Sequence, residues 1–458
     1  MKDAEFLNLR FTSARSVCTD SRRVSRGQIF FALRGERYDG HSFVAEAIQK
    51  GAACAVVDRK WRRENKAVTE VFPLIVVHDT TYALGELGRI YRQTFDIPVI
   101  AVGGSNGKTT TKEMIAKVLS KKLRVLKTAG NFNNQIGVPL TLFQLREQTE
   151  AAVIEIGTNH FGEIRRLCEV AQPTAGVITN IGSEHLAFFR SISGVEKEEG
   201  DLFEYLRKHR GTAFVNTDDP NVLYRGKSLK RKFSYGFGAG RSSRKGLFGK
   251  ILGFDSHGCA VFELEFDGEK ETVHLRVPGI HGAWNALAAA AVGFHFGLSQ
   301  RQVKKGLESY RSFEKRMQIV QAGGVKILND TYNSNPESTI AALRWLSTVR
   351  SSGRKIAVLA DMLELGRSSE REHRRVGKEI DRRKVDNLFT FGKLASEFVK
   401  GADSDVNSQS FQNKEDLCDV LVNTVAAGDV VLVKGSRGMK MEEVVSELAR
   451  RLEAKEIG

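Results

Sequence analysis

Residues 98–119 have the sequence PVIAVGGSNGKTTTKEMIAKVL, which indicates the architecture of the chain. Its first five residues form an apolar run that is typical of a buried strand, and residues 108–119 carry a helical pattern. The loop between them contains three glycines. Glycines let backbone N–H groups curl around phosphate oxygens, and the positive end of the following helix points at the same phosphates. The stretch therefore predicts a phosphate-binding loop between a strand and a helix.

The side chains of this loop suggest how phosphates would be held. Lys108 can neutralise the charge of the β- and γ-phosphates, and the hydroxyl of Thr109 can bind Mg²⁺. The motif departs from the usual GxxxxGK[ST] spacing, because Val102 occupies the position of the first glycine. We expect the ATP contacts to come from Gly104, Ser105, Asn106, Gly107, Lys108, Thr109 and Thr110.

Similar apolar runs, separated by helical patterns, predict the rest of the architecture. The runs are residues 28–33, 53–57, 74–77, 152–156, 175–179, 327–330, 356–360 and 430–433, and solvated turns at 225–250 are expected to lead into further strands at 260–266 and 273–277. Continuous apolar strands between helices indicate parallel sheets that are covered on both faces. Because 458 residues exceed one ordinary core, we expect an α/β protein of three domains. These are a small α/β domain at 1–95, a central phosphate-loop domain at 96–312 and a C-terminal Rossmann-like domain at 313–458.

The composition limits the class of protein. Hydrophobic residues make up 41% and charged residues 27%, which is typical of a globular chain. No apolar run is long enough for a membrane span, and the N-terminus does not resemble a secretory signal, so we expect a cytoplasmic protein without stable membrane insertion. The five cysteines are scattered and never form a CxxC pair, which argues against disulfides and zinc sites.

The net charge of +15 has two explanations that charge alone does not separate. A positive field attracts nucleic acid, and it equally attracts a phosphorylated, carboxylated small substrate. Residues 225–250, rich in Lys, Arg, Gly and Ser, could bind RNA if aromatic rings stood between the charges. Phe233, Tyr235 and Phe237 are present, but their alternation also suits a strand. We favour the small-molecule substrate and expect no nucleic-acid partner.

Three polar residues outside the loop are candidates for the reaction centre. Glu155 ends an apolar run, which makes it a candidate metal ligand at the carboxyl end of a parallel strand. His185 follows the run at 175–179, and Glu199 lies in the acidic segment GVEKEEGD at 194–201. The alternatives remain a solvated strand end, a structural histidine and an acidic helix face.

The order of motifs along the whole chain resembles one enzyme family. The loop from Gly104 to Thr111 resembles the ATP site of the Mur ligases and of the related folylpolyglutamate synthases. Further segments resemble the branch that uses D-alanyl-D-alanine. They are DSR at 20–22, FFALRG at 30–35, DGH at 39–41, GNFNNQIGVPLT at 130–141, HGAWNALAAAA at 281–291, NDTYNSNP at 329–336 and VKGSRGM at 433–439.

The resemblance implies an ATP-dependent ligase that serves peptidoglycan synthesis, and through it cell shape and division. The first domain would bind the UDP end of UDP-N-acetylmuramoyl-tripeptide, and the second would bind ATP and magnesium. The third would close over the site and help hold the nucleotide and the incoming dipeptide. The peptide carboxylate would attack the γ-phosphate, and the dipeptide amine would then attack the acyl phosphate.

The resemblance also implies a role for individual residues. Lys108, Glu155, His185 and Glu199 would be catalytic, and Thr109, Glu155, His185 and Glu199 would hold magnesium. Asn285 and Arg316 would contact the nucleotide, and Asp330 would orient its ribose. The substrates would be bound by Ser21, Arg22, Asn134, Thr158, His160, Asn335, Lys434, Ser436 and Arg437.

Two positions depart from the family pattern. Many Mur ligases carry a lysine that CO₂ carbamylates, and aligning Gly194-Val195 and Gly200 places Glu199 at that position. We hypothesise that Glu199 supplies a genetically encoded carboxylate. Lys197 is the rival, but it lies two positions away, roughly 200° around a helix. Ala187 stands where the family often has an acidic residue, so one metal or water contact is missing there.

Other functions remain open on the sequence alone. The chain could be a sibling ligase of the Mur or folylpolyglutamate type, although residues 131–141 and 330–336 argue against it. It could also be a nucleotide-binding scaffold that has lost catalysis, which the departures at Glu199 and Ala187 suggest. The intact Lys108-Thr109, Glu155 and His185 argue against this alternative. We expect a monomer that uses ATP, Mg²⁺ and two small-molecule substrates.

Overall fold

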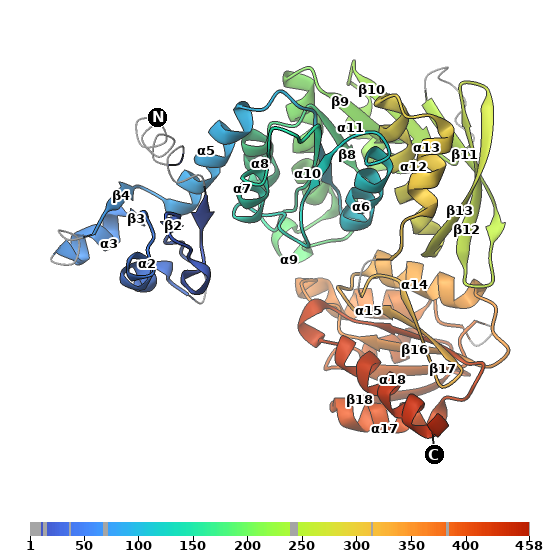
Figure 1. The fold of residues 1–458 in the computed structure, drawn as a ribbon. Helices are drawn as coiled ribbons and strands as arrows, with labels where there is room; N and C mark the ends of the chain where they lie inside the picture. Colours follow the sequence, from blue (N-terminus) through green and yellow to red (C-terminus); the bar gives the residue numbers. More distant parts are fainter. Residues whose placement is uncertain are drawn as a thin grey trace. The chain divides into compact units, whose positions relative to one another are not determined.

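The computed structural model describes residues 11, 16–35, 38–66, 72–238, 246–312, 315–381 and 384–457. The contacts within the chain divide it into two compact units. The first consists of Met1–Gly103, Leu123–Gly176 and Asp201–Thr212, and the second of Gly104–Lys122, Val177–Gly200 and Ala213–Gly458. Three β-sheets organise the described residues (Figure 1).

The first sheet is parallel and belongs to the first unit. Its strands, in spatial order, are β1 (Val17–Cys18), β2 (Ile29–Phe31), β3 (Cys54–Asp58) and β4 (Leu74–Val77). Its helices are η1 (Ser21–Arg23), η2 (Gly40–Phe43), α2 (Val44–Gln49), α3 (Arg59–Glu64) and α5 (Thr80–Gln93). Ile29 and Phe31 join one core cluster and Phe30 joins another, because successive side chains of a strand point to opposite faces.

The second sheet has nine strands, and the division between the two units falls inside β8. The strands are β5 (Val99–Gly103), β6 (Val125–Lys127), β7 (Ala151–Glu155), β8 (Ala175–Ile178), β9 (Thr212–Asn216), β10 (Lys232–Gly236), β11 (Gly246–Phe254), β12 (Cys259–Phe266) and β13 (Glu269–Pro278). In the first unit β6, β7 and β5 pair in parallel. In the second unit β9, β10 and β11 are parallel, whereas β11, β12 and β13 form an antiparallel meander.

The helices around this sheet are α6 (Lys108–Leu119), α7 (Gly137–Leu142), α8 (Glu163–Ala171), α9 (Leu186–Phe189), α10 (Ile192–Lys208), α11 (Pro220–Gly226), α12 (Ile280–His295) and α13 (Gln300–Glu308). In the second unit α12 packs directly against α6, the helix that follows the phosphate loop. Small residues permit this approach, since a Cβ on Gly293 would lie 2.6 Å from a methyl group of Val118.

The basic stretch at 225–250 enters this sheet as strands, with residues 239–245 outside the described part. Tyr235 is buried in β10. Phe233 stacks on Phe266, and Phe237 packs edge-on against Phe262. Tyr235 is thus part of the core, whereas Phe233 and Phe237 are half-buried and pack against other rings of the sheet.

The third sheet lies in the second unit and has six strands. They are β14 (Gln318–Ala322), β15 (Val325–Asp330), β16 (Lys355–Ala360), β17 (Asn387–Phe391), β18 (Asn407–Phe411) and β19 (Val430–Lys434). Their spatial order is β14-β15-β19-β16-β17-β18, and only the pairing of β14 with β15 is antiparallel. The accompanying helices are α14 (Pro336–Thr348), η3 (Gly366–Ser368), α15 (Ser369–Gly377), α16 (Ser396–Gly401), α17 (Lys414–Thr424), η4 (Arg437–Met439) and α18 (Glu442–Ile457).

These sheets confirm the predicted α/β class and place a strand at each predicted apolar run. The predicted domain boundaries near residues 95 and 312 stay predictions. All five cysteines are buried. In the part of the chain that is described, we find no helix with the length and apolarity that a membrane span requires.

Candidate functional site

The phosphate loop has the backbone geometry that its glycines predict. Gly104 and Gly107 adopt φ values of 111° and 80°, which side-chain-bearing residues rarely adopt. A Cβ on Gly104 would lie 2.3 Å from Oγ1 of Thr179, and one on Gly107 would lie 2.6 Å from Oδ1 of Asn285. The predicted nucleotide residue Asn285 therefore lies directly against the loop. Among the described residues, no side chain forms a capping hydrogen bond at the N-terminus of α6, the end of a helix that can bind an anion.

Two residues at the end of β8 hold the loop in place. The backbone N–H of Ser105 donates to the carbonyl of Asn180 at 2.9 Å, and that of Asn106 donates to Oδ1 of Asn180 at 3.0 Å. The carbonyl of Asn106 accepts from Nδ2 of Asn180 and from Oγ1 of Thr179. The loop is thus preorganised before any phosphate binds.

Two buried carboxylates lie beside this loop. Nζ of Lys108 donates to the carbonyl of Gly104 and lies 3.3 Å from Oε2 of Glu184. Glu199 is fully buried, and its Oε2 accepts a hydrogen bond of 2.6 Å from the backbone N–H of Gly104. The structure therefore brings the predicted Lys108 and Glu199 to one place, together with Glu184.

Burial makes the Glu199 carboxyl group a weaker acid than an exposed glutamate. Loss of solvation, helped by the charge of Glu184, raises the pKa of Glu199 to about 8. Lys108 and the N–H of Gly104 oppose this rise. Two carboxylates thus share one lysine in a place with little water, an arrangement that favours an additional cation.

The predicted ligand His185 is held by a residue far away in the sequence. Nδ1 of His185 lies 2.8 Å from Oε2 of Glu364. This ion pair keeps the pKa of Glu364 below its usual value, chiefly through the hydrogen bond from His185. Thr109 is buried in the first turn of α6, and Thr110 is half-buried there.

One predicted residue of the C-terminal segment reaches the phosphate loop. Nδ2 of Asn335 donates to Oδ1 of Asn106 at 2.8 Å. Asn335 also caps α14, where its own side chain accepts from the backbone N–H of Ser338. The cap fixes this side chain next to the loop.

The other predicted residues of this segment gather at the ends of β15 and β19. Lys434, whose side chain is buried, pairs with Oδ2 of Asp330 at 2.6 Å. Arg316 lies over the ring of Tyr332, with its guanidinium carbon 3.7 Å from the ring centroid. The backbone N–H of Met317 donates to Oδ1 of Asp330. This hydrogen bond connects the Lys434–Asp330 ion pair to the segment that carries Arg316.

Ser436 and Arg437 follow directly after β19. The hydroxyl of Ser436 donates to the carbonyl of Ser334 and accepts from the N–H of Leu363. Arg437 lies 5.6 Å from the centroid of the Tyr332 ring. The segment thus presents two guanidinium groups around one aromatic ring.

The predicted residues of the first unit form two separate groups. Glu155 is buried at the end of β7, where its Oε1 accepts from Nδ2 of Asn133 at 2.9 Å. Nearby in the sequence, Oδ1 of Asn134 accepts from the N–H groups of residues 136 and 137. Thr158 donates to Oε2 of Glu163, which also accepts from the backbone N–H of His160.

Ser21 and Arg22 lie in η1 of the first unit. Oγ of Ser21 donates to Oε2 of Glu46 at 3.2 Å. Arg22 is exposed and forms an ion pair of 2.8 Å with Asp20. This pairing lowers the pKa of Asp20 to about 2.

The donor set of the second unit fits magnesium. Among the described residues, no group of three or more His, Cys, Asp or Glu side chains is arranged to hold a metal ion. However, Oε1 of Glu184 and Oε1 of Glu199 are buried, and no donor group of the described chain reaches either oxygen, while the two carboxyl groups contact each other. Such oxygens suit a hard divalent cation.

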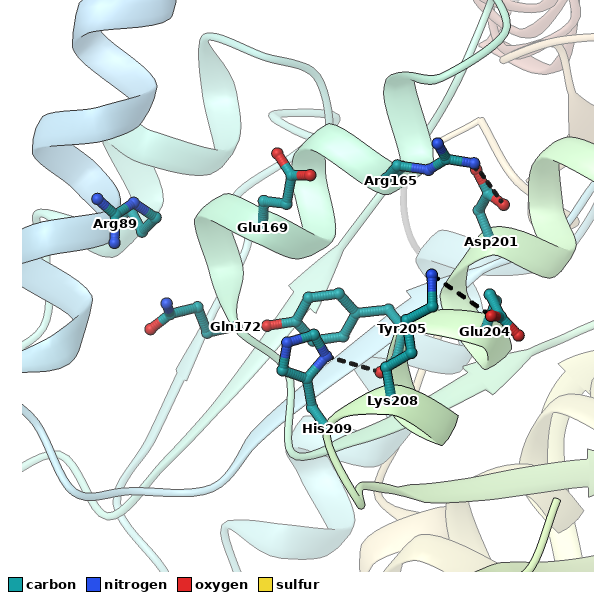
Figure 2. Close-up of a pocket in the computed structure, with 9 residues that line it drawn as sticks. All are labelled: Arg89, Arg165, Glu169, Gln172, Asp201, Glu204, Tyr205, Lys208 and His209. Atoms are coloured by element: carbon teal, nitrogen blue, oxygen red, sulfur yellow. Dashed lines mark hydrogen bonds and ion pairs between the residues drawn. The ribbon is translucent and has the colours of Figure 1, made fainter. Parts of the chain in front are cut away.

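A pocket of about 310 Å³ opens elsewhere, in the first unit between α5, α8 and α10 (Figure 2). It is lined by Arg89, Arg165, Glu169, Gln172, Asp201, Glu204, Tyr205, Lys208 and His209. Most of its charges are paired with one another, as Figure 2 shows for Arg165 with Asp201. None of the predicted site residues lines it.

Sequence reasoning missed several residues of the site. Asn180 and Glu184 lie in the segment TNIGSEH that ends with His185, and their position after a predicted strand was the available signal. Asn133 directly precedes the predicted Asn134. Glu364 had no local signal, because its partner His185 is distant in the sequence.

Comparison with protein-family models places Mur ligase domains along nearly the whole chain. Residues 14–92 match the catalytic domain of the Mur ligase family, residues 102–293 the Mur ligase middle domain, and residues 315–437 the Mur ligase glutamate ligase domain.

Curated relatives cover the chain almost from end to end. The UDP-N-acetylmuramoyl-tripeptide–D-alanyl-D-alanine ligase of Bacillus subtilis is 38% identical over 95% of this chain and 93% of its own length. The Escherichia coli ligase of the same name is 35% identical over 94% of this chain and 93% of its own length.

Solved structures agree with these relatives. MurF from Acinetobacter baumannii superposes with a TM-score of 0.86 at 33% identity, covering 95% of this chain and 93% of that chain. MurF from Thermotoga maritima, crystallised with ADP, has a TM-score of 0.85 at 27% identity, covering 96% and 99%. From this agreement in sequence and fold we conclude that the chain belongs to the Mur ligase family.

Proposed function

We propose that this chain is an ATP-dependent ligase that adds D-alanyl-D-alanine to UDP-N-acetylmuramoyl-tripeptide during peptidoglycan precursor synthesis. The observation that carries this assignment is the near end-to-end match to ligases of that name, centred on an intact phosphate loop. The MurF structure with ADP supports the use of ATP.

The reaction needs two steps. A carboxylate oxygen of the tripeptide attacks the γ-phosphorus of ATP, ADP leaves, and an acyl phosphate forms. The dipeptide amine then attacks the acyl carbon, the C–O bond to phosphate breaks, and the amine proton passes to a base or to water. The first step brings two anions together, so cationic groups must offset their repulsion.

Residues of the phosphate loop and of the C-terminal segment have different roles in this reaction. Lys108 sits at the phosphate loop, where it faces the β- and γ-phosphates and stabilises the charge of the phosphoryl transfer. Asn106 and Asn335 hold the loop against the C-terminal segment. Arg316 and Asp330 contact the nucleotide from that segment, and Lys434 fixes Asp330.

We assign magnesium to the oxygens beside the loop and to the predicted histidine. Thr109, Glu184, Glu199 and His185 would hold it from the second unit, and the buried Oε1 atoms of the two glutamates support this. Glu155 remains a predicted ligand from the first unit. When bound, the ion would neutralise phosphate charge and orient the phosphoryl group.

Glu199 is proposed as the encoded counterpart of a carbamylated lysine. It points at the N–H of Gly104 from inside the protein, whereas the rival Lys197 is exposed. A buried carboxylate that needs no CO₂ predicts full activity in CO₂-depleted buffer. A large loss of activity that bicarbonate restores would instead favour a carbamylated lysine.

Substrate binding in the first unit is proposed at two places. Ser21 and Arg22 would meet the UDP part, where the exposed guanidinium of Arg22 can exchange Asp20 for a phosphate. Asn134, Thr158 and His160 would line the side of the peptide. Ser436 and Arg437 would receive the dipeptide carboxylate.

The scheme needs no nucleic acid and no second copy of the chain, and its polar substrates suit a cytoplasmic monomer.

The assignment is tested by ATP-dependent phosphate release with UDP-N-acetylmuramoyl-tripeptide and a panel of amines. We expect release with D-alanyl-D-alanine and a product whose mass grows by the dipeptide. Turnover with a single amino acid or glutamate instead would assign the chain to a sibling ligase. ATP binding without turnover with any amine would identify an inactive scaffold.

A further inference from the structure

Two distant segments of the second unit meet at His185. One is the start of α9, and the other is the loop that leads into η3. Nδ1 of His185 lies 2.8 Å from Oε2 of Glu364. The backbone N–H of Ala187 donates to the carbonyl of Glu364 at 3.2 Å. Glu364 therefore contacts the α9 segment through both its side chain and its backbone.

The backbone at this contact is held in an uncommon conformation. His185 and Glu364 have φ values of 46° and 68°, in the left-handed region that non-glycine residues rarely occupy. Such conformations persist where the surroundings fix them, and they cluster at functional sites.

The small residue at position 187 belongs to the same contact. A Cβ on Gly366 would lie 3.3 Å from Cα of Ala187, so the two segments touch here. An acidic side chain at position 187 would add a negative charge close to that of Glu364. In this chain the carboxylate beside His185 thus comes from residue 364.

The chemistry of the pair fixes the histidine. A carboxylate only accepts hydrogen bonds, so the hydrogen lies on Nδ1 of His185. Nε2 is then the nitrogen that can bind a metal ion or a phosphate oxygen. The His185 side chain is 19% exposed, which leaves it a route to a ligand.

We propose that Glu364 is a positioning residue that orients His185 and fixes its Nδ1–H tautomer, so that Nε2 faces the reaction centre. Because Glu364 precedes η3 and His185 precedes α9, the histidine is competent only while these two segments are together. The role of Glu364 in catalysis rests on the proposed function, whereas its effect on the tautomer of His185 does not.

Kinetics give the first test. Glu364→Ala should lower kcat about 10- to 100-fold, the usual loss for an outer partner of a metal-binding histidine. Glu364→Gln keeps an acceptor oxygen and should fall between Glu364→Ala and the unmodified enzyme. The KM for UDP-N-acetylmuramoyl-tripeptide should change less than twofold. Glu370 is an exposed glutamate on α15, so Glu370→Ala is the matched control and should retain full activity.

The second test needs no turnover. In the ligand-free full-length protein, ¹⁵N-histidine NMR reports the tautomer of His185, which His185→Gln identifies by the loss of its signals. We expect the Nδ1–H form in the unmodified protein and in Glu370→Ala, and a shift toward Nε2–H in Glu364→Ala. Thermal unfolding of each variant checks that it is folded.

The outcomes separate the two proposals. An unchanged tautomer, or a kcat equal to that of Glu370→Ala, would overturn the positioning role. A changed tautomer in a chain that forms no product with D-alanyl-D-alanine would contradict the proposed function, while the orienting effect of Glu364 would stand.

Discussion

The phosphate loop of the second unit and the Ser21–Arg22 segment of the first unit balance charge in opposite ways. Beside the loop, Lys108 faces two buried carboxylates, and one of them, Glu199, has a pKa raised to about 8. In the first unit, the exposed Arg22 pairs with Asp20, whose pKa falls to about 2. Ionisation of Glu199 at the loop therefore lacks a matching positive charge, whereas the exposed pair of Arg22 and Asp20 is already neutral.

The difference indicates what each region is built to do. Ionising a buried carboxyl group without a matching cation is costly, so such a group is kept where a bound cation offsets its charge and the chemistry gains. An exposed pair is weak and rearranges easily, so Arg22 can turn to a diphosphate at small cost. Substitutions at the loop should therefore affect kcat, and substitutions at Arg22 should affect KM.

The largest effect is expected for Lys108→Met. This change removes the cation that faces the phosphates, and we expect kcat to fall about 10³-fold or more, because charge stabilisation is the main source of catalysis in phosphoryl transfer. Phosphate release measures it. Lys117→Met, on the exposed face of α6, is the control and should stay within twofold. Equal losses in both variants would refute the role of Lys108.

Glu199→Gln should lower kcat about 10²-fold. The amide has nearly the same shape but lacks the charge that a magnesium ion requires. Glu204→Gln on the same helix should have little effect, because Glu204 is paired with Arg207 instead. A titration with magnesium would show whether saturating metal restores the activity of Glu199→Gln. Complete restoration would contradict a role of Glu199 in the chemical step.

Arg22→Ala should raise the KM for UDP-N-acetylmuramoyl-tripeptide about 10-fold and leave kcat unchanged, because a charge-assisted contact with phosphate favours ground state and transition state alike. Steady-state kinetics at two salt concentrations provide the measurement. The neighbouring Arg23→Ala is the control. A fall in kcat would mean that Arg22 acts in the chemistry.

The smallest effect concerns stability. The folded state raises the pKa of Glu199 from 4.5 to about 8, so between these values the folded state holds a proton that the unfolded state has released. Glu199 therefore contributes stability at low pH that is lost as the pH rises toward 8. The Tm of Glu199→Gln minus that of the unmodified protein should grow by roughly 2 °C or more from pH 5.5 to 8.5. A constant difference would show that Glu199 is charged throughout.

The sequence predicted the secondary-structure elements better than the tertiary contacts between them. The strands and the phosphate loop follow from local patterns, such as the apolar run at 98–102 before the glycines. Helical geometry also pointed to Glu199 over Lys197, and the structure buries the first and exposes the second. These inferences needed only residues close together in the chain.

The missed residues depend on tertiary contacts. Glu184 pairs with Lys108, which lies 76 positions earlier, and no local pattern relates them. Glu364 contacts His185 only because the third sheet brings its loop to α9. Residue roles at Ser21, Arg22, Asn134, Thr158, His160 and the C-terminal segment stay predictions, since they concern ligands.

The proposed reaction converts the tripeptide carboxylate into an acyl phosphate at the loop. The transfer of an oxygen isotope from the carboxylate to phosphate tests this step. A tripeptide substrate with both oxygens of the reacting carboxylate labelled with ¹⁸O is incubated with ATP and D-alanyl-D-alanine, and the phosphate and the product are analysed by mass. We predict one ¹⁸O in each released phosphate and one in the new amide carbonyl. Unlabelled phosphate would contradict the account, because ATP would then be hydrolysed without activating the carboxylate.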